Sequence, residues 1–306
     1  NGVKHGIGKL TKGGLIQLST QIVDDVLKIG IRNSGHYVNG LGTHAGLGIP
    51  NTIQRLKLLY GDAAHFATIT ASGYLRRTVE RVRHAIDLVR EHVRWEYDDL
   101  PFFDGEVEPC INGSTVGIGA AFGQDVSGIV DRLLTEPMAD GGWNCEQENG
   151  SIRGSADSTI NVLEGLLAYE RATGASPEVT AARRGGEAFL LDRRLLRRLS
   201  TGELMDEDFT RLHFPTRWHY DVLRALDYLR DAGIQPDERV DEAIELVRSK
   251  RDTEGRWPLE ASYSGEVFFE MEDGDGRPSR WTTLRAMRVL RWYDERRHAR
   301  PNEETT

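Results

Sequence analysis

The sequence predicts a mainly helical protein, an array of helical hairpins preceded by a small α+β unit. Apolar residues recur at spacings of three and four through most of the chain after residue 81, which is typical of amphipathic helices. The first 80 residues instead combine alternating strand-like runs with many glycines. With 306 residues, of which 39% are hydrophobic, the chain is long enough for two domains with real cores.

The first 80 residues predict a hairpin followed by a loop and a helix. We expect strands at 15–20 and 26–32 with a turn at 24–25, a helix over 51–60 and a short strand at 66–70. The glycine-rich loop before the helix is a plausible anion cradle, because glycines let N–H groups approach a phosphate and the helix dipole favours negative charge. Such loops are often only turns, so this signal is weak by itself.

The rest of the chain predicts helices separated by Gly, Pro and Trp residues. Gly174 and Gly233 follow two predicted helix ends, and Pro177 and Pro236 come shortly after them. A short hairpin is possible at 265–271. The predicted helices cover residues 82–93, 116–122, 126–134, 159–172, 178–195, 220–232, 240–251 and 283–293.

Two turn motifs recur in the second part. Residues 140–143 (DGGW) and 254–257 (EGRW) share an acidic residue, a glycine and a tryptophan. Residues 215–218 (PTRW) and 278–281 (PSRW) match each other, and each precedes an apolar helix. Repetition of a turn with a helix pair predicts hairpins that bury their faces on their neighbours.

Charge divides the chain in the same place. The net charge is −9, but residues 1–80 carry nine Lys and Arg against four Asp and Glu, and the remainder carries thirty against forty-four. Such a break suggests two parts of different origin. There is no basic stripe of the kind that binds nucleic acid, and no apolar run approaches the ~20 residues of a transmembrane helix.

The cysteine count and the first residue add two expectations. Two cysteines exclude a disulfide-rich scaffold and favour a reducing compartment, so a cytoplasmic location is expected. The chain opens on Asn1 and has no signal-peptide pattern. This predicts a fragment or a product that lacks its start, and a genuine fusion and a gene-assembly artefact both remain open.

The first part of the chain contains three motifs in order, at 1–6 (NGVKHG), at 31–35 (IRNSG) and at 46–52 (GLGIPNT) with the helix to residue 61. These motifs resemble the N, G1 and G2 boxes of the GHKL-type (Bergerat-like) ATP-binding domain of sensor histidine kinases. The similarity covers about residues 1–78. It implies Mg-ATP as a ligand, with Asn1 as the magnesium-binding amide and Asn33 where the family usually has an adenine-contacting Asp. The remaining nucleotide-binding residues that it implies are Gly35, Gly46 and Gly48.

Four segments of the second part resemble bacterial squalene-cyclase-like proteins: 140–146, 162–166, 214–223 and 256–259. These belong to the α/α-toroid superfamily of squalene and terpene cyclases and protein prenyltransferase β-subunits. The resemblance implies two concentric rings of helices around a cavity that holds an isoprenoid chain in the enzymes. Eight helices make about four hairpins, fewer than a complete ring uses, so an incomplete toroid is expected.

The candidate site residues lie at the N-termini of the helices that would face such a cavity. Acid–base chemistry needs Asp and His, and aromatic faces stabilise a carbocation. The predicted catalytic residues are Asp157, Arg217, His219, Tyr220 and Asp221. The predicted ligand-binding residues are Trp143, Cys145, Trp218, Arg280 and Trp281. The Asp-x-Asp-Asp motif of squalene cyclases does not occur in the sequence, which favours binding over catalysis and leaves open whether the protein is an enzyme.

A zinc site of the prenyltransferase kind is not expected. Its ligands would be Cys145 and His219 with Cys110 as a third, but the matching pattern in related proteins has a histidine where this chain has Asp157. Two cysteines at distant positions are more often small buried hydrophobic residues.

Together these observations predict a partial kinase-like unit at 1–80, a toroid domain at 81–298 and a disordered tail at 299–306, with the junction at 78–83. The expected function is binding of an isoprenoid or other apolar molecule in a central cavity. The alternatives are an ATP-binding fragment of a histidine kinase and a non-catalytic scaffold of helical repeats. The sequence carries no prediction of oligomeric state.

Overall fold

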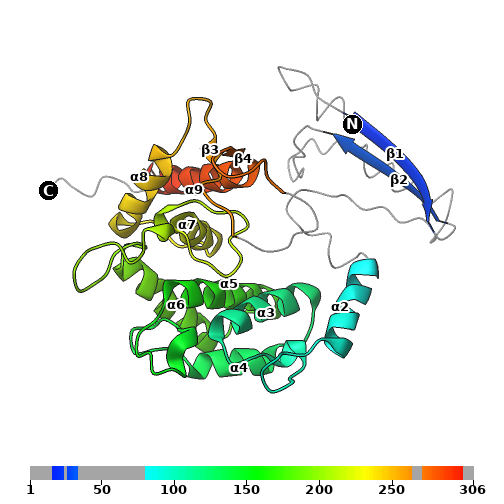
Figure 1. Ribbon diagram of the computed structural model, residues 1–306, viewed down its shortest axis with the longest axis horizontal. Helices are drawn as coiled ribbons and strands as arrows, with labels where there is room; N and C mark the ends of the chain where they lie inside the picture. Colours follow the sequence, from blue (N-terminus) through cyan, green and yellow to red (C-terminus); the bar gives the residue numbers. More distant parts are fainter. Residues whose placement is uncertain (1–15, 24–25, 34–79, 264–270, 299–306) are drawn as a thin grey trace. The chain divides into compact units, whose positions relative to one another are not determined.

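A computed structural model describes residues 16–23, 26–33, 80–263 and 271–298 (Figure 1). Contacts within the chain divide it into two units, Asn1–Thr78 and Val79–Thr306, and each is described by itself. The predicted segments 51–60 and 66–70, most of 265–271 and the tail at 299–306 lie outside the described residues.

The described part of the first unit is an antiparallel hairpin. Strand β1 (Ile16–Val23) pairs with β2 (Val26–Asn33), from Ile16 opposite Asn33 to Val23 opposite Val26. Two residues connect the strands, the commonest hairpin length. The two predicted strands are therefore confirmed.

The second unit is mainly helical, which confirms the predicted fold class at this level. A two-residue antiparallel ladder joins β3 (Trp257–Pro258) to β4 (Pro278–Ser279). None of the helices in the described part of the chain is both long and apolar enough to cross a membrane. The helices are α2 (Glu80–His92), α3 (Pro109–Phe122), α4 (Ser127–Thr135), α5 (Ala156–Thr173), α6 (Pro177–Asp192), α7 (Val222–Asp231), α8 (Asp241–Ser249) and α9 (Arg280–His298).

Several helices begin earlier than the apolar spacing predicts, and α3 differs most. Helix α3 starts at Pro109 rather than at residue 116, because its first half is built from small and polar residues without an apolar stripe. Proline suits the first position of a helix, where its missing N–H would have no partner. Helix α9 starts at Arg280 rather than 283.

Alternate helices along the chain are neighbours in space. Helix α3 packs on α5 and α7 packs on α9, while α4 lies against both α3 and α6, and α8 against both α7 and α9 (Figure 1). The chain therefore runs as successive hairpins. They share one hydrophobic core that extends from α3 to α9.

The two Trp turns make equivalent contacts. The buried indole of Trp143 donates to the Leu133 carbonyl at 2.9 Å, and that of Trp257 donates to the Val247 carbonyl at 2.6 Å, in each case ten residues earlier. Their backbone N–H groups donate to a threonine in the fourth position of the next long helix, Thr159 or Thr283. Each tryptophan thus joins the end of one helix to the start of another.

Glycine and serine complete both turns in the same way. Gly141 and Gly255, two residues before each tryptophan, have φ of +84° and +82°, a left-handed conformation that glycine adopts without a Cβ penalty. Ser155 and Ser279 pair with the two tryptophans across short bridges. Their hydroxyls accept the N–H groups three residues on, at the starts of α5 and α9. The motif repeated in the sequence is therefore a repeated structural unit.

The tightest helix contact lies between α3 and α5. A Cβ atom on Gly113 would lie 2.5 Å from the Asn161 carbonyl oxygen, and one on Gly165 would overlap the Gly113 carbonyl oxygen. The two backbones approach so closely only because both positions lack a side chain. The absence of an apolar stripe in the first half of α3 has the same cause.

Replacing Gly165 with alanine should destabilise the protein although alanine is the better helix former. The new methyl group must push α3 away, and we expect a loss of about 2 kcal/mol in the free energy of unfolding. The control is Gly128→Ala in α4, where a new Cβ would meet no atom of the described residues within 4 Å; it should gain about 0.5–1 kcal/mol. Urea denaturation measures both, and equal effects would show that α3 and α5 are not in close backbone contact.

Candidate functional site

Three rings from the segment between α6 and α7 and a fourth, Tyr263, from the segment after β3 form a stack that we call the aromatic column. His213 stacks on Tyr263, Tyr263 on His219, and His219 on Trp218, with ring centroids 4.6, 3.6 and 3.6 Å apart. His213 is buried, His219 and Tyr263 are half-buried and Trp218 is exposed. The column therefore runs from the core to the surface.

Three side chains from α5 and α7 hold the backbone of the column's outer end, and we call these contacts the clamp. They bind three consecutive residues, so the exposed end of the column has a fixed backbone. The bonds run from Asn161 Nδ2 to the Trp218 carbonyl (2.6 Å), from Arg224 Nη1 to the His219 carbonyl (2.7 Å) and from the Tyr220 N–H to Asp157 Oδ1 (2.7 Å).

Arg224 is the centre of the clamp. Its buried guanidinium makes two bonds to the Glu164 carboxylate, at 3.0 and 2.7 Å, and a third to Asn161 Oδ1 at 2.9 Å. Ser114 of α3 donates to the same Asn161 oxygen at 3.2 Å. A forked pair of this kind fixes orientation as well as charge, so α3, α5 and α7 are tied into one network.

The inner end of the column lies between two carboxylates. His213 Nε2 is 3.5 Å from Asp208 Oδ2, and its Nδ1 is 3.8 Å from Asp221 Oδ2. The Tyr263 hydroxyl donates to Asp208 at 3.2 Å. Asp221 is fully buried and accepts the N–H groups of His213 and Arg224, and thereby caps α7.

At the outer end of the column, burial shifts the pKa values of Asp157 and His219 in opposite directions. It raises the pKa of Asp157, against the effect of the Tyr220 N–H and the nearby charges of His219 and Arg224. Burial lowers the pKa of His219, and the Asp157 carboxylate opposes that shift. The site thus pairs a carboxyl group that holds its proton more strongly than usual with an imidazole that holds its proton less strongly.

The predicted catalytic residues fall in one region but differ in surroundings. Asp157 and His219 belong to the clamp and the column. The Tyr220 ring is buried, its hydroxyl donates to the Leu195 carbonyl at 2.7 Å, and burial raises its pKa well above the usual value. Burial also raises the pKa of Asp221. The Arg217 side chain is exposed on a backbone with φ of +50°.

The predicted ligand-binding residues are divided among three places. Trp218 ends the column, and Trp281 stacks on Phe214 with centroids 5.3 Å apart. Exposed Arg280, next to Trp281, donates to the Met271 carbonyl at 2.8 Å. Trp143 is in the core of its turn, and Cys145 lies beside Cys110 at 2.7 Å between the sulfur atoms. The structure therefore does not join Cys145 and His219 in one metal-capable group among the described residues.

The nucleotide-binding prediction falls almost entirely outside the described residues. Asn1, Gly35, Gly46 and Gly48 are not described. Asn33 ends β2 opposite Ile16, and only its backbone is described. ATP and magnesium binding at this unit stays a prediction.

Six residues of the site were not predicted. Two of these are the clamp residues Asn161 and Arg224, and a third is Glu164, which binds Arg224. All three lie on helix faces among apolar residues, and only this interruption of an apolar face by polar residues could have indicated a role in the site. His213 lies six residues before His219, and both flank the predicted turn. Asp208 and Tyr263 have no local signal, and the hydrogen bond between them joins segments 55 residues apart.

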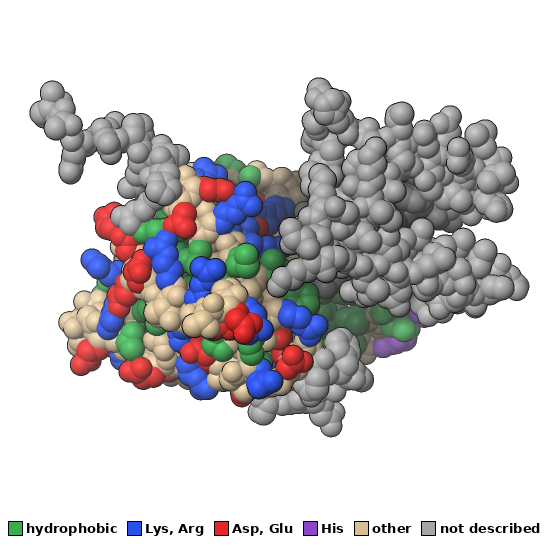
Figure 2. Space-filling model, turned by 90° about the horizontal axis from the view of Figure 1, so that it is seen from above, with side chains coloured by type: hydrophobic (Ala, Val, Ile, Leu, Met, Phe, Trp, Pro, Cys, Tyr) green, Lys and Arg blue, Asp and Glu red, His purple; other side chains and the backbone are tan. Residues whose placement is uncertain are grey.

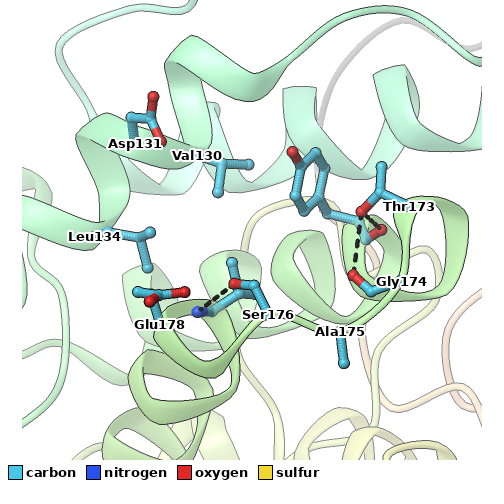
Figure 3. Close-up of a pocket in the computed structure, with 10 residues that line it drawn as sticks. Val130, Asp131, Leu134, Thr173, Gly174, Ala175, Ser176 and Glu178 are labelled. Carbon is cyan, nitrogen blue, oxygen red and sulfur yellow. Dashed lines mark hydrogen bonds between the residues drawn. The ribbon is translucent and has the colours of Figure 1, made fainter.

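One cavity of the described unit lies away from the aromatic column. A hollow of about 560 Å³ lies between α4 and the turn from α5 to α6, bordered by Val130, Leu134, Gly174 and Glu178 (Figure 3). It contains none of the predicted site residues.

Comparisons of the chain with protein-family models, with curated proteins and with solved structures gave no match. The geometry of the aromatic column and the clamp is therefore the basis for inferring function.

The shift of His219 predicts how stability depends on pH. When the pKa of a histidine is lower in the folded than in the unfolded state, the unfolded state binds the proton more readily. The free energy of unfolding then rises with pH between the two pKa values, and this contribution is lost at lower pH. Folding stability should therefore increase as the pH rises from the acidic range toward about pH 7, above the ordinary histidine pKa of about 6.5, and it should increase less steeply in a His219→Gln variant. Urea denaturation across this range measures the difference, and parallel profiles for the two proteins would contradict the prediction.

Proposed function

We propose that the helical unit binds an apolar small molecule of the isoprenoid class. The observation that carries this proposal is a set of large apolar side chains exposed beside the aromatic column, which we call the apolar surface. Trp218 is 53% exposed, and Trp281, Leu284 and Met287 of α9 are 37%, 37% and 57% exposed. Large apolar residues that are exposed near one another are typical of a binding surface.

Spacing and stacking join these residues. Trp281, Leu284 and Met287 lie three residues apart, so they share one side of α9. Phe214 stacks on Trp281 and directly follows His213 of the column. The clamp holds the Trp218 backbone in place, so a ligand that covers the ring would lose little affinity to ordering of the site.

The arrangement of helices supports an open toroid as the setting of this surface. Alternate helices pack together, and exposed apolar side chains occur on α9, in the segment before α7 and at Ile118 of α3, which is 41% exposed. In an incomplete α/α toroid, α3, α5, α7 and α9 would form the wall of the hollow. We propose this open toroid as the setting of the apolar surface.

The environment of the predicted acid–base residues favours binding over catalysis. Both faces of the His219 ring are covered, by Trp218 and Tyr263. One oxygen of Asp157 accepts a backbone N–H, and the Tyr220 hydroxyl donates to a backbone carbonyl. These groups hold the segment in place. Arg217 and Arg280 are adjacent in the sequence to Trp218 and Trp281 and would supply positive charge for a polar head group.

Removal of either exposed tryptophan should weaken binding of an isoprenoid. We expect the affinity for farnesol to fall about tenfold in Trp218→Ala and in Trp281→Ala, since each removes a large aromatic contact. The control is Ile152→Ala, which removes a 79% exposed apolar side chain in the turn before α5 and should leave the affinity unchanged. Isothermal titration calorimetry measures all three, and an equal effect of the control would assign the binding to nonspecific apolar contact.

Ligand-induced thermal stabilisation separates the three candidate functions. Farnesol, farnesyl diphosphate or squalene should raise the midpoint of thermal unfolding if the proposal holds. A rise with Mg-ATP alone would instead support the nucleotide-binding prediction for the first unit. No rise with any of these compounds would leave the helical-repeat scaffold.

A further inference from the structure

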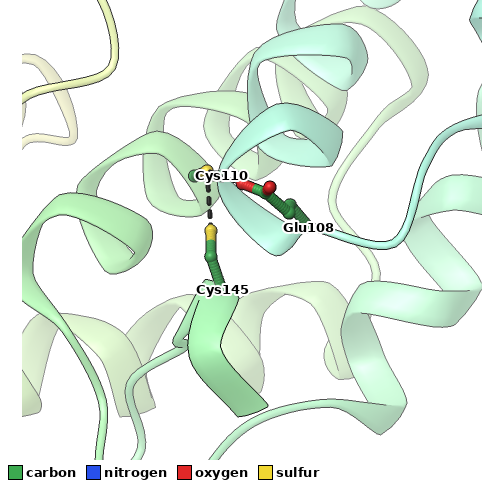
Figure 4. Close-up of side chains that lie close together, drawn as sticks. All are labelled: Glu108, Cys110 and Cys145. Atoms are coloured by element: carbon green, nitrogen blue, oxygen red, sulfur yellow. Dashed lines mark hydrogen bonds between the residues drawn. The ribbon is translucent and has the colours of Figure 1, made fainter. Parts of the chain in front are cut away.

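The two cysteines of the chain lie together, away from the aromatic column. Cys110, the second residue of α3, and Cys145, at the start of the short 3-10 helix Cys145–Gln147, point toward each other with their sulfur atoms 2.7 Å apart (Figure 4). The Glu108 carboxylate lies 3.5 Å from the Cys110 sulfur. All three groups offer an atom within 4.8 Å of the others.

The two sulfur atoms differ in accessibility. Cys110 is buried and Cys145 is half-buried. Cys145 borders a small cavity of about 190 Å³ together with Asn144, Gln147 and Glu148. Cys145 is therefore the more accessible of the two cysteines and the one that borders open space.

We propose that Cys145 and Cys110 form a reversible dithiol–disulfide pair, in which Cys145 reacts with a small-molecule disulfide and Cys110 resolves the product. This would be a redox-active modification site on the helical unit, independent of the apolar surface. The two sulfur atoms are 2.7 Å apart, so they need to approach by only about 0.7 Å to reach the length of a disulfide bond.

The reaction balances in two exchange steps. The Cys145 thiolate attacks one sulfur of the small disulfide, forms a mixed disulfide and releases the first small thiolate. The Cys110 thiol then gives its proton to the Glu108 carboxylate and attacks the Cys145 sulfur, which releases the second small thiolate. The protein loses two electrons and two protons, and the oxidant is reduced to two thiols.

The environment suits these two roles. The hydrogen bond with the Cys110 sulfur lowers the pKa of Cys145, and the Ser158 hydroxyl, which donates to Cys145 at 3.3 Å, acts in the same direction. The contact with Cys145 and burial raise the pKa of Cys110. Cys110 thus stays a thiol until the second step, when the N-terminus of α3 favours the negative charge that develops on its sulfur.

The same three groups could hold a thiophilic metal ion, but the distances favour the disulfide. Two thiolates on one tetrahedral zinc ion, each about 2.3 Å from the metal, are held about 3.8 Å apart. The sulfur atoms here are 2.7 Å apart, closer than a shared ion allows. A metal site is therefore an outcome that the test must exclude.

The test uses the whole protein, reduced and then treated with bis(2-hydroxyethyl) disulfide, a small neutral oxidant. The proposal predicts a loss of about 2 Da in the intact mass, a peptide that links Cys110 to Cys145, and full recovery of the thiols with dithiothreitol. A persistent mixed disulfide, an absence of reaction, or a stoichiometric zinc complex that blocks the reaction would each overturn it.

Variants assign the roles of the two sulfur atoms. Cys110→Ser should stop at a stable mixed disulfide on Cys145, and Cys145→Ser should react at least tenfold more slowly than the wild type. The urea-unfolded wild type is the control for folding, because there both thiols should form mixed disulfides at similar rates. Similar rates for Cys110 and Cys145 in the folded protein would contradict the proposed order.

Discussion

The clamp on residues 218–220 is the constraint on which the rest of the site depends. Side chains of two helices bind these three successive residues: Asn161 and Asp157 of α5 and Arg224 of α7. A buried guanidinium is stable only when its N–H groups are paired, and Arg224 satisfies them with Glu164, Asn161 and the His219 carbonyl. The hydrogen bonds that join α5 to α7 and the position of the exposed rings are thus one structural feature.

The scaffold behind the clamp is built by repetition. The turns at Trp143 and Trp257 each attach the start of a long helix to the end of an earlier one through an indole N–H and a threonine hydroxyl. The glycine contact then brings α3 against α5 without intervening side chains. Because these contacts fix α5 against α3 and against the end of α4, α5 can present Asp157 and Asn161 at defined positions. On the face shown in Figure 2 the basic and acidic side chains are interspersed.

Sequence patterns predicted what depends on local spacing and missed what depends on distant contacts. The mainly helical class, the first hairpin and the Trp turns follow from periodicity and turn residues, which act within a few positions. The start of α3 was missed because close backbone contact selects glycine instead of an apolar stripe. Tyr263 and Asp208 were missed because only the folded chain brings them to the column. Cys145 was predicted to bind the ligand together with Trp218 and Trp281, whereas the structure places it beside Cys110.

The most direct test of this account is the coupling between clamp and ring in ligand binding. Farnesol affinity is measured for Arg224→Met, Trp218→Ala and the double variant, with circular dichroism to show that each is folded. If Arg224 acts by placing Trp218, the double variant should bind no more weakly than the weaker single variant, so that the two losses are strongly non-additive. Fully additive losses would show that the clamp does not position the ring, and would contradict the account.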